Sequence, residues 1–195
     1  LTPLASILHD GSFDTFDSGG QNRASDALEA LAEDGNADPI VAAATAAGAD
    51  VGVITSPGGF PGAPVIDPGE TASIELNVAD PTSNRFFSFL SMVIPSNDVF
   101  IGNEDSMAYE VFDIAGAFTG LGPIQVYSNQ AYSAGTEENI GFGAPFNTAS
   151  GDGDPVETDD PIRRLGNLFF LNGQNTPDGT TINLSGRTLL ATIEI

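Results

Sequence analysis

The alternation of apolar and polar residues along the chain predicts mostly short β-strands. Residues 4–8 form an apolar run that ends in a turn at residues 9–11, which is typical of a buried strand. Residues 86–94 are almost entirely apolar, so we expect a central strand that is covered on both faces. Further strands are predicted in five segments: residues 72–78, 108–112, 124–127, 168–171 and 188–195.

Two helices are predicted between the first strand and the others. In residues 24–34 the apolar side chains recur at helical spacing, and Gly35 stands where a helix would end. The second helix begins at Asp38, a good N-cap, with Pro39 at the first helical position, and it ends before Gly48. The chain therefore changes from a strand period to a helical period only once, near its beginning.

These elements together predict a mainly β fold: an antiparallel β-sandwich with a short two-helix excursion near the N-terminus. The chain has 195 residues, which suits a single domain spanning residues 1–195. Residues 56–69 are too rich in proline and glycine for a helix or a central strand, so we expect an ordered surface connection there.

Composition narrows the classes of partner. The chain has 27 acidic and only five basic residues, all arginine, and a formal charge of -22. The negative electrostatic field of such a protein repels phosphate groups, so nucleic-acid binding is excluded and anionic membranes are poor partners. Cysteine is absent, which excludes thiolate metal sites and cysteine nucleophiles. No apolar run of about 18 residues occurs, so neither membrane insertion nor a signal peptide is expected within this chain.

The residues available for catalysis predict a protein that is not an enzyme. His9 is the only histidine, and no Gly-x-Ser-x-Gly nucleophile elbow is present. We expect His9 to be structural and to satisfy a backbone partner near the sheet edge. A hydrolase with an unrecognised carboxylate pair stays open as an alternative, because so many acids furnish chance pairs.

The most informative segment is residues 91–102, SMVIPSNDVFIG, in which an apolar strand runs into a polar turn that ends at Asp98. This run resembles the signature of the spondin amino-terminal domain family. Residues 133–137, SAGTE, resemble the acid-Ala-Gly-Thr-acid loop of that family. Residues 9–13 and 27–35 resemble its bacterial branch, so the resemblance covers nearly the whole chain.

The resemblance implies a secreted, C2-like β-sandwich that holds a calcium ion at one end. The ligands it implies are Asp98, Ser133 and Glu137. The family usually has aspartate in place of Ser133, so we expect weakened calcium affinity, because the number of carboxylates tunes calcium binding. Glu138, one residue further on, is a candidate for supplying the missing charge, as are Glu104 and Asp105.

A second acidic run, residues 152–160, superficially resembles an EF-hand loop. The EF-hand template requires glycine at its sixth position, where this run has Thr158 if Asp152 is first. We therefore reject the EF-hand interpretation and expect a solvated acidic loop.

The resemblance also implies a role. We predict a secreted, non-enzymatic module with an adhesive or structural role at the cell surface or in the extracellular matrix, where its partner is an extracellular protein or matrix component. The family has a strand before the segment at residues 4–8, and this chain has no room for one. An open sheet edge there favours an alternative: the subunit of a homo-oligomer or extracellular filament assembled by edge-strand pairing.

Overall fold

The computed structural model describes residues 1–55, 64–141, 143–147 and 153–195. Within these residues the protein is mainly β, and all strand pairs are antiparallel. One sheet has six strands, in the spatial order β2 (Asp50–Ile54), β1 (Leu4–His9), β3 (Phe86–Met92), β4 (Val99–Gly102), β6 (Tyr132–Ser133) and β7 (Arg163–Arg164). A second, small sheet pairs β5 (Ile124–Tyr127) with β8 (Leu189–Ile193).

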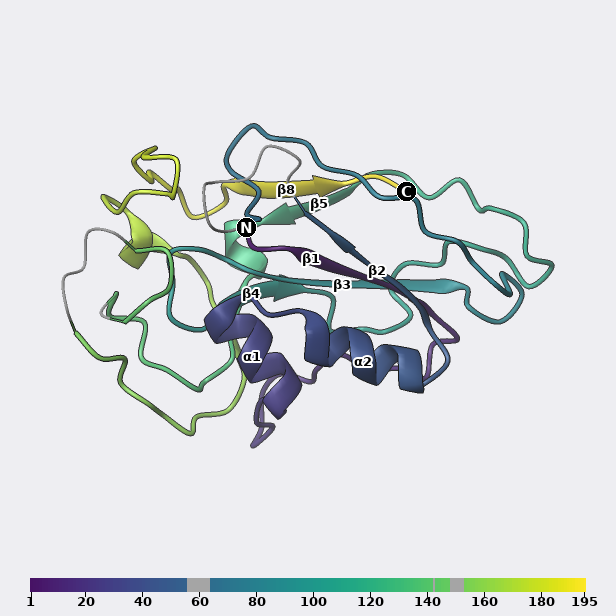
Figure 1. The fold of residues 1–195 in the computed structure, drawn as a ribbon, viewed down its shortest axis with the longest axis horizontal. Helices are drawn as coiled ribbons and strands as arrows, with labels where there is room; N and C mark the ends of the chain where they lie inside the picture. The colour runs from purple at the N-terminus through teal and green to yellow at the C-terminus, as the bar shows by residue number, and fades with distance from the viewer. Residues whose placement is uncertain (56–63, 142, 148–152) are drawn as a thin grey trace.

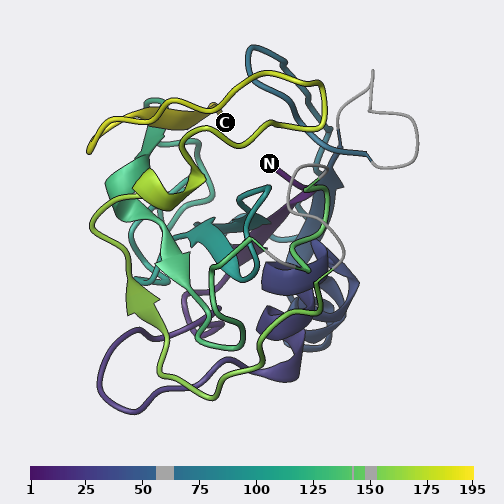
Figure 2. The same cartoon turned by 90° about the vertical axis from the view of Figure 1, so that its left-hand side faces the viewer.

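The six-stranded sheet is covered on both faces. The helices α1 (Asp26–Asp34) and α2 (Asp38–Ala46) lie on one face, and the small sheet lies on the other (Figure 1). Figure 2, turned by 90°, shows the same arrangement with β8 and the helices at opposite sides of the molecule. The mainly β character and the early helices are therefore confirmed, whereas the sheet opposite the main one has only two strands.

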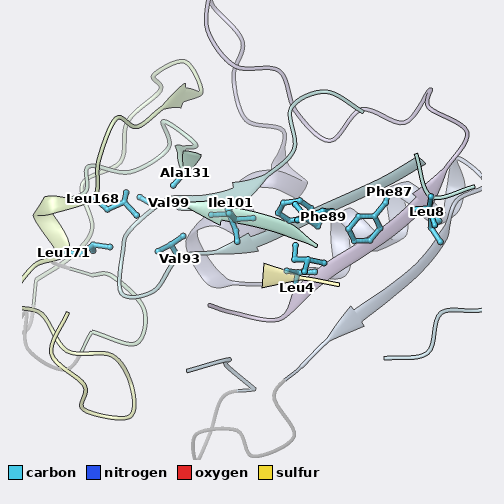
Figure 3. Close-up of a cluster of buried hydrophobic side chains, with 14 residues drawn as sticks. Leu4, Leu8, Phe87, Phe89, Val93, Val99, Ile101, Ala131, Leu168 and Leu171 are labelled. Atoms are coloured by element: carbon cyan, nitrogen blue, oxygen red, sulfur yellow. The ribbon is translucent and has the colours of Figure 1, made fainter. Parts of the chain in front are cut away.

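The apolar residues of β1 and β3 contribute to two separate hydrophobic cores, one on each face of the six-stranded sheet. Side chains alternate across a strand, so Ala5 and Ile7 pack with the helices, whereas Leu4 and Leu8 pack toward the small sheet. Figure 3 shows the second core, in which the side chains of Phe87 and Phe89 lie close to those of β1 and β4. Each such side chain contributes about 1.5–3 kcal/mol on burial. This two-sided covering explains why β3 is nearly all apolar.

Both predicted helices form. The hydroxyl of Ser25 accepts a hydrogen bond from the Leu28 N–H at 3.2 Å and caps α1. Gly35 ends α1 in the left-handed region with φ 68°, and a Cβ there would lie 2.4 Å from Thr2. For α2 the predicted cap is wrong: Asp38 is the first helical residue, and Ala37 is the N-cap without a side-chain hydrogen bond.

Three predicted strands are corrected by the structure. Residues 72–78 run without a backbone ladder, and the Ile74 side chain is 39% exposed. Residues 108–112 make only isolated bridges, such as Glu110 with Phe86. Residues 168–171 contain the 3-10 helix η2 (Phe169–Leu171) instead of a strand. None of the three segments forms a strand ladder, because an alternating apolar pattern alone does not supply a pairing partner. Ile74, Phe169 and Phe170 remain exposed.

The structure also contains strands that the apolar pattern did not reveal. These are β2, β4, β6 and β7. Because β2 pairs with β1, the predicted open edge at β1 is wrong: β1 lies between β2 and β3. No helix among the described residues is long and apolar enough to cross a membrane. Of the predicted surface connection, residues 56–63 lie outside the described residues, and residues 64–66 form no helix or strand.

Candidate functional site

The structure brings together the residues that the sequence selected as metal ligands. The turn after β3 places Asp98 directly before β4, and β4 pairs with β6 so that Val99 lies opposite Ser133. The side chains of Asp98 and Ser133 are both buried, with relative exposures of 0% and 2%. Two segments 35 residues apart therefore meet at one end of the six-stranded sheet.

The Asp98 carboxylate is surrounded by hydrogen-bond donors. Its Oδ2 accepts from the Ser133 hydroxyl at 3.0 Å, from the Gly135 N–H at 2.7 Å and from the Thr136 N–H at 3.2 Å. Its Oδ1 accepts from the Asn139 side-chain amide. We call Asp98 and these four partners the rim clasp. It fastens the loop after β6 to the turn between β3 and β4.

Asn97 and Asn139 extend the rim clasp to Glu137. The Asn97 amide donates to Glu137 Oε2 at 3.1 Å, and its carbonyl oxygen accepts from the Gly141 N–H at 3.0 Å. The Asn139 carbonyl oxygen accepts from the Asn97 N–H at 3.1 Å, so the orientation of the Asn139 amide is fixed from both sides. Glu138, in contrast, is exposed, and Glu104 instead accepts from the backbone and hydroxyl of Ser18.

Several carboxyl groups lie close together around the rim clasp, at the end of the sheet that we call the rim. Burial raises the pKa of the Glu137 carboxyl, the Asn97 amide opposes this, and the charges of Glu157 and Asp98 raise it further. Burial likewise raises the pKa of the Glu33 carboxyl on α1 from 4.5 to about 7; the Thr136 hydroxyl opposes this shift, and Glu137 adds to it. The rim is thus a place where ionised carboxyl groups repel one another.

The donor set of the rim clasp does not fit calcium as it is arranged. Calcium needs six to eight oxygen ligands, whereas two N–H groups, an amide and a hydroxyl already occupy the Asp98 oxygens. Across the part of the chain that the structure describes, no three histidine or acidic side chains converge as metal ligands. The arrangement serves to hold a loop, and the calcium site that the resemblance implies would require these hydrogen bonds to rearrange.

The described part of the acidic run, residues 153–160, is mostly exposed, as expected for a solvated loop, but it also contacts the loop after β6. Asp152 lies outside the described residues, but Thr158 and Asp160 donate backbone hydrogen bonds to Thr136 and Gly135 at 2.7 and 2.8 Å. Gly135 has φ 79°, and a Cβ there would lie 2.2 Å from the Asp160 carbonyl oxygen. Asp159 is solvated, with its side chain 88% exposed and paired to Arg23. The backbone of residues 158–160 therefore lies against the loop of the rim clasp, while the acidic side chains face solvent.

His9 has the structural role that we expected. Its ring is buried, with Nε2 3.0 Å from the Ser88 hydroxyl, and Nδ1 accepts from the Gly11 N–H at 3.1 Å. Burial lowers the pKa of the imidazole, while the charge of Asp10 raises it. Nδ1 therefore fixes the turn after β1, and Nε2 contacts the neighbouring strand β3.

A second feature, which the sequence did not reveal, is an apolar groove between the two sheets. It has a volume of about 670 Å³ and runs along β8 toward the beginning of β1. Leu4, Ile54, Ile94, Leu171 and Leu190 are among its apolar lining residues. Its charged side chains are all acidic: Asp67, Glu70 and Glu194.

The groove borders an open strand edge. In the described residues β8 pairs only with β5, and its backbone has no other hydrogen-bond partner. Leu189 at the start of β8 is 46% exposed. The only sequence signal for this edge is negative, because lysine, the commonest charged residue that protects strand edges, is absent.

Comparison with known proteins identifies no relative: no protein-family model matches the chain, and no curated protein matches it.

Proposed function

We propose that this protein is a non-enzymatic structural module whose copies join by β-strand pairing at the apolar groove. The observation that carries the proposal is the open edge of β8 beside a groove of about 670 Å³. Unpaired strand edges are templates for strand addition, and an added strand buries its apolar side chains in the adjoining groove. A completed edge of this kind would give the small sheet a third strand.

A second open edge, in the other sheet, would allow each copy to contact two neighbours. Besides β8, the outer edge of β2 has no backbone partner among the described residues. The two edges belong to different sheets, so pairing β2 of one copy with β8 of the next is a heterologous contact. Such a contact produces an open chain of copies unless its rotation closes a ring. The sequence also offered a filament as an alternative, but it placed the open edge beside residues 4–8, where β2 pairs with β1.

The proposed setting is extracellular, at the cell surface or in a matrix, and the proposed fold is a C2-like sandwich of the spondin type. The resemblance of residues 91–102 and 133–137 to the spondin signatures supports this setting. The rim clasp lends further support, since it joins those two segments through Asp98 and Ser133. The filament proposal does not depend on a bound calcium ion.

Charge predicts how assembly depends on salt. Two copies that each carry a formal charge of -22 repel one another. The screening length falls from about 10 Å at 0.1 M salt to about 3 Å at 1 M. We therefore expect assembly to strengthen as salt rises, because the apolar and backbone contacts remain while the repulsion is screened.

The test is sedimentation velocity at increasing protein and salt concentrations, with electron microscopy of the same samples. We expect large species in the wild type at high salt and only monomers in Leu189→Lys, which places a charge on the open edge. Ile114→Lys is the matched control, because Ile114 is 81% exposed and lies outside the groove. A wild type that stays monomeric throughout, or an equal effect of both substitutions, would refute self-assembly at β8.

A second candidate is an adhesive role in which the groove takes a strand from a basic extracellular protein. The acidic side chains of Asp67, Glu70 and Glu194 favour such a partner. Salt separates the two cases: it weakens binding of a basic strand and strengthens pairing between copies. A lysine-flanked, valine-rich peptide that binds at low salt, and is released at high salt, would favour the adhesive role.

A further inference from the structure

Only some of the arginines of this acidic protein form ion pairs with its own carboxylates. Of its five arginines, Arg23 pairs with Asp159 and Arg85 pairs with Glu110. The remaining three form no ion pair with any described residue, and two of them, Arg164 and Arg187, line one shallow pocket of about 530 Å³. The other lining residues are Gln125, Tyr127, Asn129 and Gln130. We call this the arginine pocket.

Four parts of the fold build the arginine pocket. Gln125 and Tyr127 belong to β5, and Arg164 belongs to β7 at the edge of the six-stranded sheet. The 3-10 helix η1 (Ser128–Gln130) follows β5 and supplies the amides. Arg187 comes from the turn before β8. The pocket therefore lies where the small sheet meets the end of the main sheet, and its lining residues are separate from those of the apolar groove.

Internal contacts hold both arginines in place. The Arg187 guanidinium lies over the Tyr127 ring, 4.3 Å from its centroid. The Arg164 Nε donates to the Asn129 carbonyl oxygen at 3.1 Å. Neither contact uses the terminal nitrogens of Arg164, and no hydrogen bond to another described residue involves the guanidinium of Arg187. Glu104, which interacts electrostatically with Arg164, lies outside the pocket lining.

Two further hydrogen bonds within the pocket occupy the side-chain oxygens of its glutamines. The Gln130 side-chain oxygen accepts from the Tyr127 N–H at 2.8 Å, which fixes the orientation of that amide. The Gln125 side-chain oxygen accepts from the Tyr127 hydroxyl at 2.8 Å. The side-chain nitrogens of Gln125 and Gln130 have no partner among the described residues. What the pocket offers a ligand is therefore mostly N–H donors together with two positive charges.

We propose that the arginine pocket binds an acidic sugar through its carboxylate. The guanidinium fork matches a planar carboxylate and can donate two parallel hydrogen bonds to it. The glutamine amide nitrogens provide donors for the hydroxyl oxygens of the sugar. Pockets of roughly 300–1,000 Å³ hold small molecules, and the arginine pocket, with about 530 Å³, lies within that range. The positive pocket also lets an anion approach a protein that otherwise repels it.

The test is calorimetric titration of the wild type with digalacturonic acid and, as the matched ligand, its neutral methyl ester. We expect the acid to bind and the ester to bind at least about tenfold more weakly, because the ester lacks the charge that strengthens a hydrogen bond from a guanidinium. Arg164→Gln and Arg187→Gln should each lower the affinity for the acid about tenfold or more. Arg163→Gln is the control, because Arg163 is the neighbouring exposed arginine of β7 and does not line the pocket.

Three results would overturn the proposal: no binding of the acid by the wild type, equal binding of the ester, or an equal loss in Arg163→Gln. Acetate binding as tightly as the disaccharide would show that the pocket recognises only a carboxylate and not a sugar, which also refutes it. Far-UV circular dichroism checks that each variant is folded. Sedimentation of Arg187→Gln should match the wild type, because the pocket and the open edge of β8 are separate features.

Discussion

Replacing Asp98 by asparagine tests whether the rim clasp holds the fold together. The substitution keeps the shape of the side chain and one oxygen, which still faces the Ser133 hydroxyl and the Gly135 and Thr136 N–H groups. In the wild type the NH₂ group of Asn139 donates to Oδ1 of Asp98. In the variant the new NH₂ group takes the place of Oδ1, so that two NH₂ groups face each other. Asn139 cannot turn its amide around without losing the bond from the Asn97 N–H.

The magnitude follows from these contacts. One hydrogen bond is lost and a buried donor is left unpaired, which costs about 1–3 kcal/mol. The remaining three hydrogen bonds lose their charge, and bonds to charged groups are roughly twice as strong as neutral ones. We therefore expect Asp98→Asn to lower the free energy of unfolding by about 3 kcal/mol. For a domain of this size that corresponds to a drop in melting temperature of about 6–12 °C.

A double substitution provides the sharpest control. In Asp98→Asn with Asn139→Asp, the new amide at position 98 donates to a carboxylate at position 139, which still accepts from the Asn97 N–H. We expect the double variant to recover at least about 1 kcal/mol of the loss. Asp113→Asn is a second control, because Asp113 also accepts backbone N–H groups but on an exposed turn, and we expect it to cost under about 1 kcal/mol.

The assay is urea unfolding followed by far-UV circular dichroism, since the chain has no tryptophan. A loss below about 1 kcal/mol in Asp98→Asn would refute the structural role of the carboxylate. A double variant that is less stable than either single variant would refute the pairing with Asn139.

Two further predictions concern the rim. The pKa of Glu33 is about 7 in the fold against an ordinary value of 4.5, so the fold holds a proton that the unfolded chain releases, and stability falls as the pH rises from about 4.5 to about 7. After allowance for solvent screening, Glu33→Gln should be more stable than the wild type by about 1 kcal/mol at pH 8, and the two proteins should be equally stable at pH 4. Urea unfolding at both pH values measures this difference. An equal gain at both pH values would contradict this reasoning. Calcium added after chelation should leave the melting temperature of the wild type unchanged, because hydrogen-bond donors occupy the Asp98 oxygens; a rise that disappears in Asp98→Asn would show that the rim clasp rearranges into a calcium site.

The sequence by itself determined the elements whose signals are local. The helical spacing of the apolar residues in 24–34 and the stop at Gly35 predicted α1 from neighbouring residues alone, and Gly35 is its left-handed C-cap. The apolar run of β3 is long enough to identify a strand buried on both faces. The two segments that resemble spondin signatures suggested Asp98, Ser133 and Glu137 as calcium ligands; the structure joins Asp98 to Ser133 by a hydrogen bond, and their role as ligands stays a prediction.

Only the tertiary structure decided which extended segments become strands. Residues 72–78 have the better alternating pattern, yet β2, which is interrupted by Gly52, is the segment that pairs with β1. A strand needs a partner edge at the right distance, and that edge comes from residues far away in the sequence. The same reason applies to β6 and β7, which have only two residues each and form because β4 lies beside β6.

The tertiary structure also decided what the polar residues do. From the sequence, the carboxylate of Asp98 is equally suited to a cation and to N–H groups; the loop after β6 surrounds it with N–H donors. Arg164 and Arg187 are 23 residues apart and carry no motif, and they share a pocket only because the two sheets meet there. Local patterns determine the type of each segment, whereas long-range packing determines which side chains share a site.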